Sequence, residues 1–191
     1  MDYFEEKDLL SSFRILVDTR EQPTAKAKSR YEAFGCPHGR ATLRYGDYTY
    51  NATLPSGKML YDESETLQPR CVIERKMSLD ELAGCFGRGR ERFEREFERA
   101  IGAGSRIFLL VENGSWEAIL NHRYRSRLHP NAFMASLTAW TVRYGMTPIF
   151  CKAETSGKLI REILYRDLKE RLERGEFDGA ASEPEAIHQT V

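Results

Sequence analysis

The chain has 191 residues, and its 29 Lys and Arg balance its 29 Asp and Glu, so the formal net charge at pH 7 is zero. A chain of this length buries about 70% of the surface of its unfolded state, which fits one compact domain. Its apolar runs are too short to span a bilayer, its N-terminus is acidic rather than signal-like, and its four cysteines form no Cys-x-x-Cys pair. We therefore expect a soluble intracellular protein, cytoplasmic if the host is prokaryotic or viral, without a disulfide framework or a zinc ribbon.

The first predicted strand is the run Arg14–Asp18. Because Arg20 and Glu21 follow it, the end of this strand carries an acid (Asp18), a base and an acid. An aspartate in this position is as typical of a helix cap as of a functional site. Residues 1–13, which precede the strand, are an acidic segment to which we assign no role.

Two strand-like runs follow, at residues 41–45 and 48–54, and Gly46-Asp47 separates them. Glycine allows a bend in a strand, and such a bend presents the Asp47 side chain. An Asp beside a Gly is also common in ordinary turns. The segment between Asp47 and Glu74 contains a Pro-Ser-Gly turn and several acids, which predicts an extra hairpin.

The most informative stretch is Cys71-Val-Ile-Glu-Arg-Lys-Met-Ser-Leu-Asp80. Its apolar start is typical of a buried strand, and strand side chains alternate between the two faces of a sheet. Glu74 and Lys76 therefore share one face, and Arg75 points to the other. A carboxylate beside an ammonium group suits a metal ion held against a phosphate, but an ion pair at a strand end has the same pattern.

A helix is predicted directly after this strand, because Ser78 followed by Glu81 fits a capping box. The first turn of that helix contains Asp80. We therefore expect the Asp80 carboxylate to stand close to Glu74 and Lys76.

The remaining elements alternate between helices and strands. Phe93 and Phe97 lie four residues apart, which predicts a helix that buries this face and exposes most of its charges. Further along, we predict a strand at 106–111, a helix at 131–144 between Pro130 and Gly145, a strand at 147–151, and a helix at 155–174 before Gly175. Elements in this order predict an α/β domain with a mixed central sheet flanked by helices.

Several basic residues are candidates for contacts with nucleic-acid phosphates. Some lie between glycines just after the predicted helix at Asp80, and others occur in a run that contains a tyrosine. A solvated surface is the alternative for each of them. They are Lys26, Lys28, Arg30, Arg88, Arg90, Arg123, Arg125 and Arg127.

Together these motifs resemble the nuclease domain of the XPF-type structure-selective endonucleases. The signature of that family, Gly-Asp and then Glu-Arg-Lys-x-x-x-Asp, is matched by Gly46-Asp47 and by residues 74–80, and its Val-Asp-x-Arg-Glu strand is matched by residues 17–21. Gly89-Arg90, Phe93 and the apolar strand ending at Glu112 are similar to later family features in the same order. The resemblance covers most of the chain from Arg14 to about Leu168 and implies the restriction-endonuclease-like core.

Two features depart from the family pattern. The segment between Asp47 and Glu74 is longer than expected, and a short acidic tail stands where many members carry a tandem helix-hairpin-helix module. We therefore expect residues 14–175 to be a lone nuclease domain and residues 176–191 to be a disordered tail.

The resemblance implies a magnesium-dependent DNA endonuclease, with manganese as a substitute, that hydrolyses a phosphodiester by in-line attack of water. Magnesium prefers oxygen ligands and keeps several waters, so Asp47 and Glu74 suffice as its anchors. Lys76 is expected to orient the attacking water or to neutralise the transition state.

The remaining roles also rest on the resemblance. Asp18, Glu21 and Asp80 are expected to hold a second ion or to orient waters, with Asp18 as a further metal ligand. Arg20 and Arg75 are expected either to grip DNA phosphates or to brace the carboxylates. The predicted catalytic set is thus Asp18, Glu21, Asp47, Glu74, Lys76 and Asp80, and the predicted DNA-binding set is Arg20, Arg75, Arg88, Arg90, Arg123, Arg125 and Arg127.

Two other functions stay open. One is a non-catalytic DNA-binding or scaffold subunit, and the other is a nuclease of ordinary single- or double-stranded DNA in viral or mobile-element processing. Branched DNA, such as a flap or fork, is the expected substrate of the leading hypothesis. A homodimer through the nuclease domain is also expected, with Phe133, Leu137 and Trp140 as one face that serves it or instead packs on its own sheet.

Overall fold

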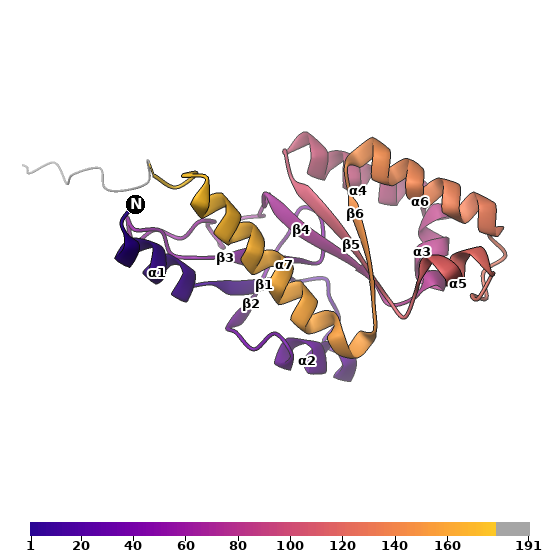
Figure 1. Cartoon of the computed structure of the whole chain (residues 1–191), viewed down its shortest axis with the longest axis horizontal. Coiled ribbons are helices and arrows are strands. Elements are labelled where there is room, and N and C mark those ends of the chain that lie inside the picture. Colours follow the sequence, from indigo (N-terminus) through magenta and orange to yellow (C-terminus); the bar gives the residue numbers. More distant parts are fainter. Residues whose placement is uncertain (179–191) are drawn as a thin grey trace, which may run out of the picture.

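The computed structural model describes residues 1–178, which contain one mixed six-stranded sheet with the order β2-β1-β3-β4-β5-β6 (Figure 1). Strands β4, β5 and β6 run parallel to one another, β1 and β2 are also parallel, and β3 is antiparallel to both of its neighbours. The strands are β1 (Arg14–Asp18), β2 (His38–Ala41), β3 (Tyr48–Asn51), β4 (Cys71–Lys76), β5 (Arg106–Glu112) and β6 (Thr147–Cys151).

Helices cover both faces of this sheet, as the sequence predicts. The long helix α7 crosses one face with α1 and α2 beside it, and α3, α4 and α6 gather on the other (Figure 1). The helices are α1 (Tyr3–Ser11), α2 (Ala25–Glu32), α3 (Leu79–Phe86), α4 (Arg90–Gly102), α5 (Trp116–Leu120), α6 (Pro130–Tyr144) and α7 (Ala153–Glu173).

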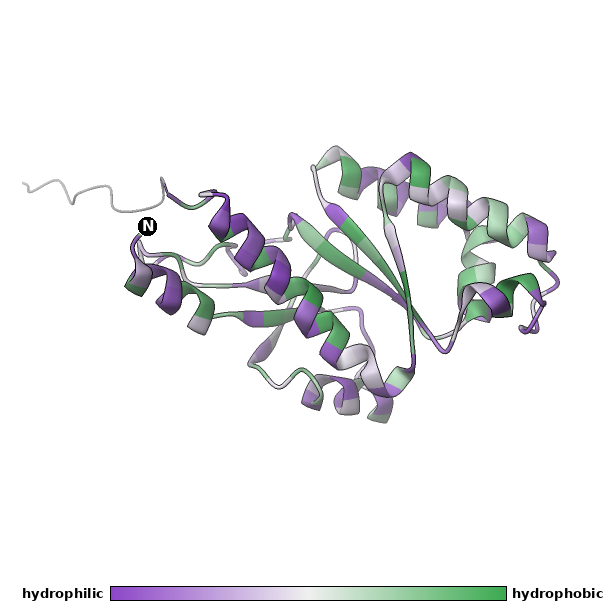
Figure 2. Ribbon diagram, in the orientation of Figure 1, coloured by the Kyte–Doolittle hydropathy of each residue, from purple (hydrophilic) through white to green (hydrophobic). Residues whose placement is uncertain are grey.

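The sheet separates two hydrophobic cores. Figure 2 shows hydrophobic residues along β4 and β5 and hydrophilic ones along much of α7, whose buried stripe includes Ile160 and Leu164. On the opposite face an aromatic cluster contains Phe97 and Trp140. Burial of apolar surface on both faces holds the sheet between its helices. Each Å² of apolar surface removed from water stabilises the fold by about 25 cal/mol.

The predicted dimer face is part of this second core. Phe133, Leu137 and Trp140 are each 0% exposed, and the Trp140 ring stacks on Phe93 with ring centroids 4.9 Å apart. The proposal that these three residues serve a partner is therefore wrong, and the alternative, packing on the domain's own sheet, is confirmed. The spacing of these residues indicated correctly that they are buried, and they are buried inside the domain's own core.

The chain ends and the insert differ in part from the expectation. Residues 1–13 contain α1, whose Leu9 packs in the core under α7, and Phe177 is 4% exposed. Folded structure thus includes residues 176–178, and the rest of the expected tail, 179–191, lies outside the described residues. The predicted hairpin appears as a short turn around Gly57, closed by a bridge between Thr53 and Met59. None of the helices described is long and apolar enough to cross a membrane.

The topology gathers charged residues at one edge of the sheet. Strand β4 is parallel to β5, and it is also parallel to β1 because each is antiparallel to β3. The carboxyl ends of β1, β4 and β5, carrying Asp18, Glu74 and Glu112, therefore meet at the edge where β3 begins. Asp47 directly precedes β3 and so lies at the same edge.

The glycine before Asp47 is required by the packing of this edge. Gly46 has φ +75°, and a Cβ added to it would lie 2.8 Å from the Cβ of Val72 in β4. Left-handed backbone costs a non-glycine residue roughly 1–2 kcal/mol, and the contact with Val72 adds to that cost. Gly46 thus lets β3 start close against β4.

We predict that Gly46→Ala lowers the free energy of unfolding by at least about 1 kcal/mol more than Gly57→Ala. The matched control shares the strained conformation, with φ +78°, but a Cβ there meets nothing within 4 Å. Urea denaturation of both variants measures the difference. Equal losses would show that backbone strain alone, and not the approach to β4, requires a glycine at residue 46.

Candidate active site

Asp47 is fixed between two strands by its backbone. Its N–H donates to the carbonyl of Ile73 at 2.9 Å, and its carbonyl accepts from the N–H of Asp18 at 2.9 Å. Its side-chain Oδ2 accepts from the N–H of Arg75 at 2.7 Å. These three bonds direct the Asp47 carboxylate to the end of β4, beside Glu74.

Glu74 and Lys76 lie on the same face of β4, as the alternation of strand side chains predicts. Lys76 Nζ donates to Glu74 Oε1 at 2.5 Å, and the two residues are only 8% and 4% exposed. The Nζ also lies 4.8 Å from the centre of the Phe93 ring. The ammonium group is therefore held between a carboxylate and an aromatic face, in little contact with water.

One oxygen of this cluster has no partner. Glu74 Oε2 is buried and accepts no hydrogen bond from any described residue. Because a buried carboxylate oxygen without a partner is costly, its presence points to a ligand that supplies positive charge. A cleft of about 250 Å³ opens beside it, lined by Glu74, Lys76, Glu81, Gly84, Cys85, Gly89, Arg92, Phe93 and Glu96.

The oxygens of Asp47 and Glu74 fit a hard divalent cation such as Mg²⁺. Within residues 1–178, no group of three or more His, Cys, Asp and Glu side chains is arranged to hold a metal ion. The protein thus offers two carboxylates, and Mg²⁺ usually keeps several waters when one or two carboxylates hold it.

The charges of the cluster are out of balance. Burial raises the pKa of Asp47 to about 6, even though Lys76 and the N–H of Arg75 act in the opposite direction. Burial, and next the charge of Asp47, raise the pKa of Glu74 to about 8. Burial is the largest influence on Lys76 and would lower its pKa, but the negative charges around it, with Glu74 first, together outweigh burial, raise the pKa and keep this ammonium charged. One ammonium faces two carboxylates, so the cluster takes up a proton or a cation.

Sequence reasoning missed one acid at this site. Glu96, on α4, accepts from the N–H of Gly46 at 3.1 Å and lines the cleft beside Glu74. The spacing of Phe93 and Phe97 predicts that most charges of this helix are exposed to solvent, and it did not single out Glu96. Glu96 directly precedes Phe97 and follows Phe93 by three residues, so it borders the buried stripe, and that position was the available signal.

On the opposite face of β4, Arg75 belongs to a closed ring of ion pairs. Its guanidinium contacts Glu112 and Glu21, both at 3.2 Å, and Arg30 contacts the same two carboxylates at 3.1 and 3.4 Å. Tyr48 OH donates to Glu21 at 3.1 Å. Two cations and two anions balance here, so Arg75 braces the strand that carries Glu74 and Lys76. Neither it nor Arg30 is exposed enough to grip DNA.

Asp18 and Arg20 form a separate unit at the same edge. Arg20 Nε donates to Asp18 at 2.7 Å, and the N–H groups of Arg20 and Leu43 donate to the same carboxylate at 2.7 and 2.9 Å. Asp18 is 1% exposed and already saturated with donors. The structure therefore does not support Asp18 as a metal ligand, or Glu21, which the ring of ion pairs engages, as an anchor for a second ion.

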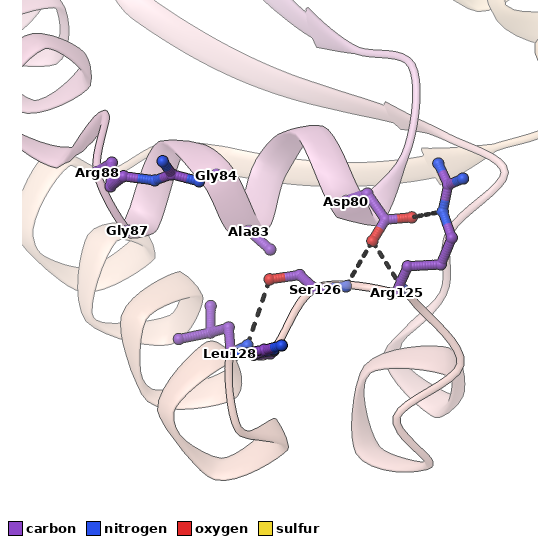
Figure 3. A pocket seen from close by; sticks show the side chains of 9 residues that line it. Asp80, Ala83, Gly84, Gly87, Arg88, Arg125, Ser126 and Leu128 are labelled. Carbon is purple, nitrogen blue, oxygen red and sulfur yellow. Dashed lines mark hydrogen bonds and ion pairs between the residues drawn. The ribbon is translucent and has the colours of Figure 1, made fainter.

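Asp80 lies in the first turn of α3, as predicted, but its carboxylate contacts Arg125 and Ser126 instead of the Glu74–Lys76 pair. Oδ1 accepts from the N–H groups of Arg125 and Ser126 at 2.7 and 2.8 Å (Figure 3). Slight burial raises its pKa, but these donors outweigh burial and hold the pKa below its usual range. The expected closeness of Asp80 to the Glu74–Lys76 pair is therefore not found.

The comparisons with known proteins agree with this geometry. The family model described as "ERCC4 domain" matches residues 17–163, which span every residue of the site. The chain belongs to the ERCC4 domain family. No curated protein sequence matches it.

The ERCC4 domain of this chain is also similar to solved structures. "XPF from Aeropyrum pernix" has 21% identity and a TM-score of 0.57, covering 85% of this chain and 69% of that one. The structure "XPF from Aeropyrum pernix, complex with DNA" has 22% identity and a TM-score of 0.56, covering 82% of this chain and 65% of that one. These likenesses show the fold, so the expected restriction-endonuclease-like core with its mixed sheet is confirmed.

The charge imbalance of the ERCC4 site predicts a pH-dependent response to metal. Because the folded pKa of Glu74 lies above its ordinary value of 4.5, its protonated form stabilises the metal-free protein. That contribution is present below about pH 4.5 and is lost as the pH rises towards about 8. Mg²⁺ binds the deprotonated form, so it should raise the Tm more at about pH 8 than at about pH 6.

Differential scanning fluorimetry with and without Mg²⁺ measures this response. Glu74→Gln should abolish the Mg²⁺-induced shift, and Glu91→Gln, an exposed acid of α4, should preserve it. An equal shift at both pH values, or a shift that survives in Glu74→Gln, would contradict the assignment of the metal to Glu74.

The ring around Arg75 predicts a large stability effect. Glu112→Ala leaves two buried guanidinium groups with one carboxylate, so the free energy of unfolding should fall by about 3–5 kcal/mol. Glu162→Ala, which breaks exposed pairs on α7, should change it by less than about 0.5 kcal/mol. Chemical denaturation compares the two variants, and similar small losses would show that the ring contributes little.

Proposed function

We propose that this protein is a metal-dependent DNA endonuclease that hydrolyses phosphodiester bonds at branched DNA such as flaps and forks. The observation that supports it most directly is the half-buried Asp47 beside the buried Glu74, one of whose carboxylate oxygens is left without a partner at an open cleft. Membership of the ERCC4 domain family supports the same proposal.

Asp47 and Glu74 hold Mg²⁺ or Mn²⁺ through their carboxylate oxygens. When bound, the ion stabilises charge on the phosphoryl oxygens and lowers the pKa of a coordinated water. The Gly46 turn, the N–H of Arg75 and the β4 backbone keep the two carboxylates in place before substrate arrives, so little reorganisation is needed during the reaction.

Lys76 acts through its charge. It stays protonated because Glu74 faces it, so it is an electrostatic group rather than a general base. It lines the cleft beside Phe93, where partial exclusion of water strengthens its effect on a phosphate that gains negative charge. Glu96 fixes the Gly46 N–H and keeps the Asp47 turn in register with the cleft.

Exposed arginines near the cleft supply the contacts with DNA. Arg88, Arg123 and Arg127 are exposed, Arg90 is half-buried, and the Arg125 side chain is 94% exposed. One similar structure is that of XPF in complex with DNA, which supports a DNA substrate for this domain. A preference for branches, a homodimer and an intracellular location stay predictions.

The test is cleavage of labelled flap, fork, single-stranded and duplex DNA with Mg²⁺ or Mn²⁺. Glu74→Gln keeps the shape of the side chain and removes its charge, so it should lower the cleavage rate by about a hundredfold to a thousandfold. Lys76→Met, which keeps the stem but not the ammonium, should lower the rate by about a hundredfold. Thermal melting confirms that each variant is folded.

Glu91→Gln is the matched control, because that acid is exposed on α4 and should leave the rate unchanged. Full activity in Glu74→Gln would contradict the proposal. Binding of branched DNA without cleavage by the native protein would instead favour the scaffold hypothesis, and equal cleavage of all four DNAs would favour a nuclease without regard to branches.

A further inference from the structure

A second hollow adjoins the candidate active site across α3. Its volume is about 740 Å³, and its walls are formed by α3, by the link from α3 to α4, and by the segment 125–128 (Figure 3). Gly84 lines both this hollow and the cleft that contains Glu74. The two spaces are therefore neighbours, with one residue of α3 on their common border.

The hollow is basic on both sides. Arg88 lies at one end of α3, beyond Gly87, and Arg125 and Arg127 come from the facing segment. No described residue makes an ion pair with Arg88 or Arg127, and Arg125 contacts Asp80 through Nε at 3.4 Å while 94% exposed. Guanidinium groups arranged around a hollow of this size fit phosphate oxygens, which they bind with charge-assisted hydrogen bonds.

The floor of the hollow is open because it is built from small residues. Ala83, Gly84 and Gly87 line it, and a Cβ added to Gly84 would meet nothing within 4 Å. A glycine inside an exposed helix weakens that helix relative to alanine. No packing contact among the described residues requires a glycine here, and its effect is to leave room over α3 for the close approach of a ligand.

The arginine segment is attached to α3 by Asp80. A single oxygen, Oδ1, accepts from the N–H groups of Arg125 and Ser126, at 2.7 and 2.8 Å. The acid that ends the Glu-Arg-Lys-x-x-x-Asp motif thus contacts the wall of the hollow and not the metal carboxylates. It fixes where Arg125 and Arg127 stand relative to Arg88.

We propose that this hollow, defined by Gly84, Gly87, Arg88, Arg125 and Arg127, is the seat for the DNA backbone that continues from the scissile phosphate, and that Asp80 is its positioning residue. The inference rests on the proposed nuclease function for the identity of the ligand. It assigns the motif acids to separate tasks: Asp47 and Glu74 hold metal, and Asp80 holds the segment that binds substrate.

The first test measures binding of fluorescein-labelled flap DNA in EDTA, by anisotropy, at several salt concentrations. Arg88→Ala and Arg127→Ala should each weaken binding and reduce the slope of log Kd against log salt by about 0.7–0.9. Gly84→Leu should weaken binding while the Tm stays the same or rises. Gly102→Leu, at an exposed glycine of α4 where a Cβ also meets nothing, is the matched control and should bind as the native protein does.

Native affinity and slope in all three variants would overturn the proposal. Loss of binding in the arginine variants with native binding in Gly84→Leu would also overturn it, because the phosphates would then lie outside the hollow.

The second test separates positioning by Asp80 from a role in metal binding. Asp80→Asn keeps an oxygen for the two backbone N–H groups, and Asp80→Ala does not. We therefore expect Asp80→Ala to raise the Kd for DNA and to expose the segment at Arg123–Arg127 to trypsin, and we expect Asp80→Asn to restore both. The kcat at saturating DNA should stay close to that of the native protein in both variants.

An equal fall of kcat in Asp80→Asn and Asp80→Ala would overturn the positioning role, since only loss of the charge is common to both. Binding in EDTA does not depend on cleavage. If the native protein binds DNA and does not cut, the proposed function fails and the seat stands. If it cuts while the variants of the hollow bind normally, the seat fails and the function stands.

Discussion

One charge imbalance organises this protein: two carboxylates, Asp47 and Glu74, face a single ammonium group, that of Lys76, where little water reaches them. An excess of negative charge with little access to water is unfavourable for the fold, and among the described residues Lys76 and Arg75 offset it only in part. The surrounding structure holds the carboxylates together nonetheless, through the Gly46 turn and the backbone of β4. Such a site is less stable without a cation than with one. This difference in stability is expected of a centre that binds Mg²⁺ and a phosphate.

The other face of the same strand is built on the opposite principle. Arg75, Arg30, Glu21 and Glu112 close a ring in which each charge contacts two opposite charges. Because side chains alternate along β4, a balanced and an unbalanced cluster lie back to back, only one residue apart in sequence. The balanced ring fixes the strand, and so it fixes the position of the unbalanced pair. The Glu-Arg-Lys order therefore has a structural reason for its central arginine as well as a chemical reason for its flanking residues.

The sequence predicted what depends on local pattern. The alternation of Glu74, Arg75 and Lys76, the end of α6 at Gly145 and the strand Thr147–Cys151 were all predicted correctly. Half of the predicted capping box is present, because the N–H of Glu81 donates to Ser78 Oγ. In the other half, the Glu81 carboxylate accepts from the N–H of Met77 instead of that of Ser78. Contacts between distant segments were not predictable from spacing: Asp80 with the segment at Arg125, Asp18 with Leu43, and Glu96 with Gly46 join residues from 25 to 50 positions apart. The short helix α5 was missed because its apolar stripe is too brief to show a period.

The central claim is that Asp47 and the unpartnered Glu74 Oε2 hold a divalent cation. The most direct measurement is a crystal structure of the protein grown with Mn²⁺, with anomalous difference density recorded at the manganese edge. We expect one strong peak between the Asp47 and Glu74 carboxylates, with waters completing its coordination, and no peak in Glu74→Gln crystals. A peak at Asp18 or Asp80, or none in the native crystals, would contradict the account.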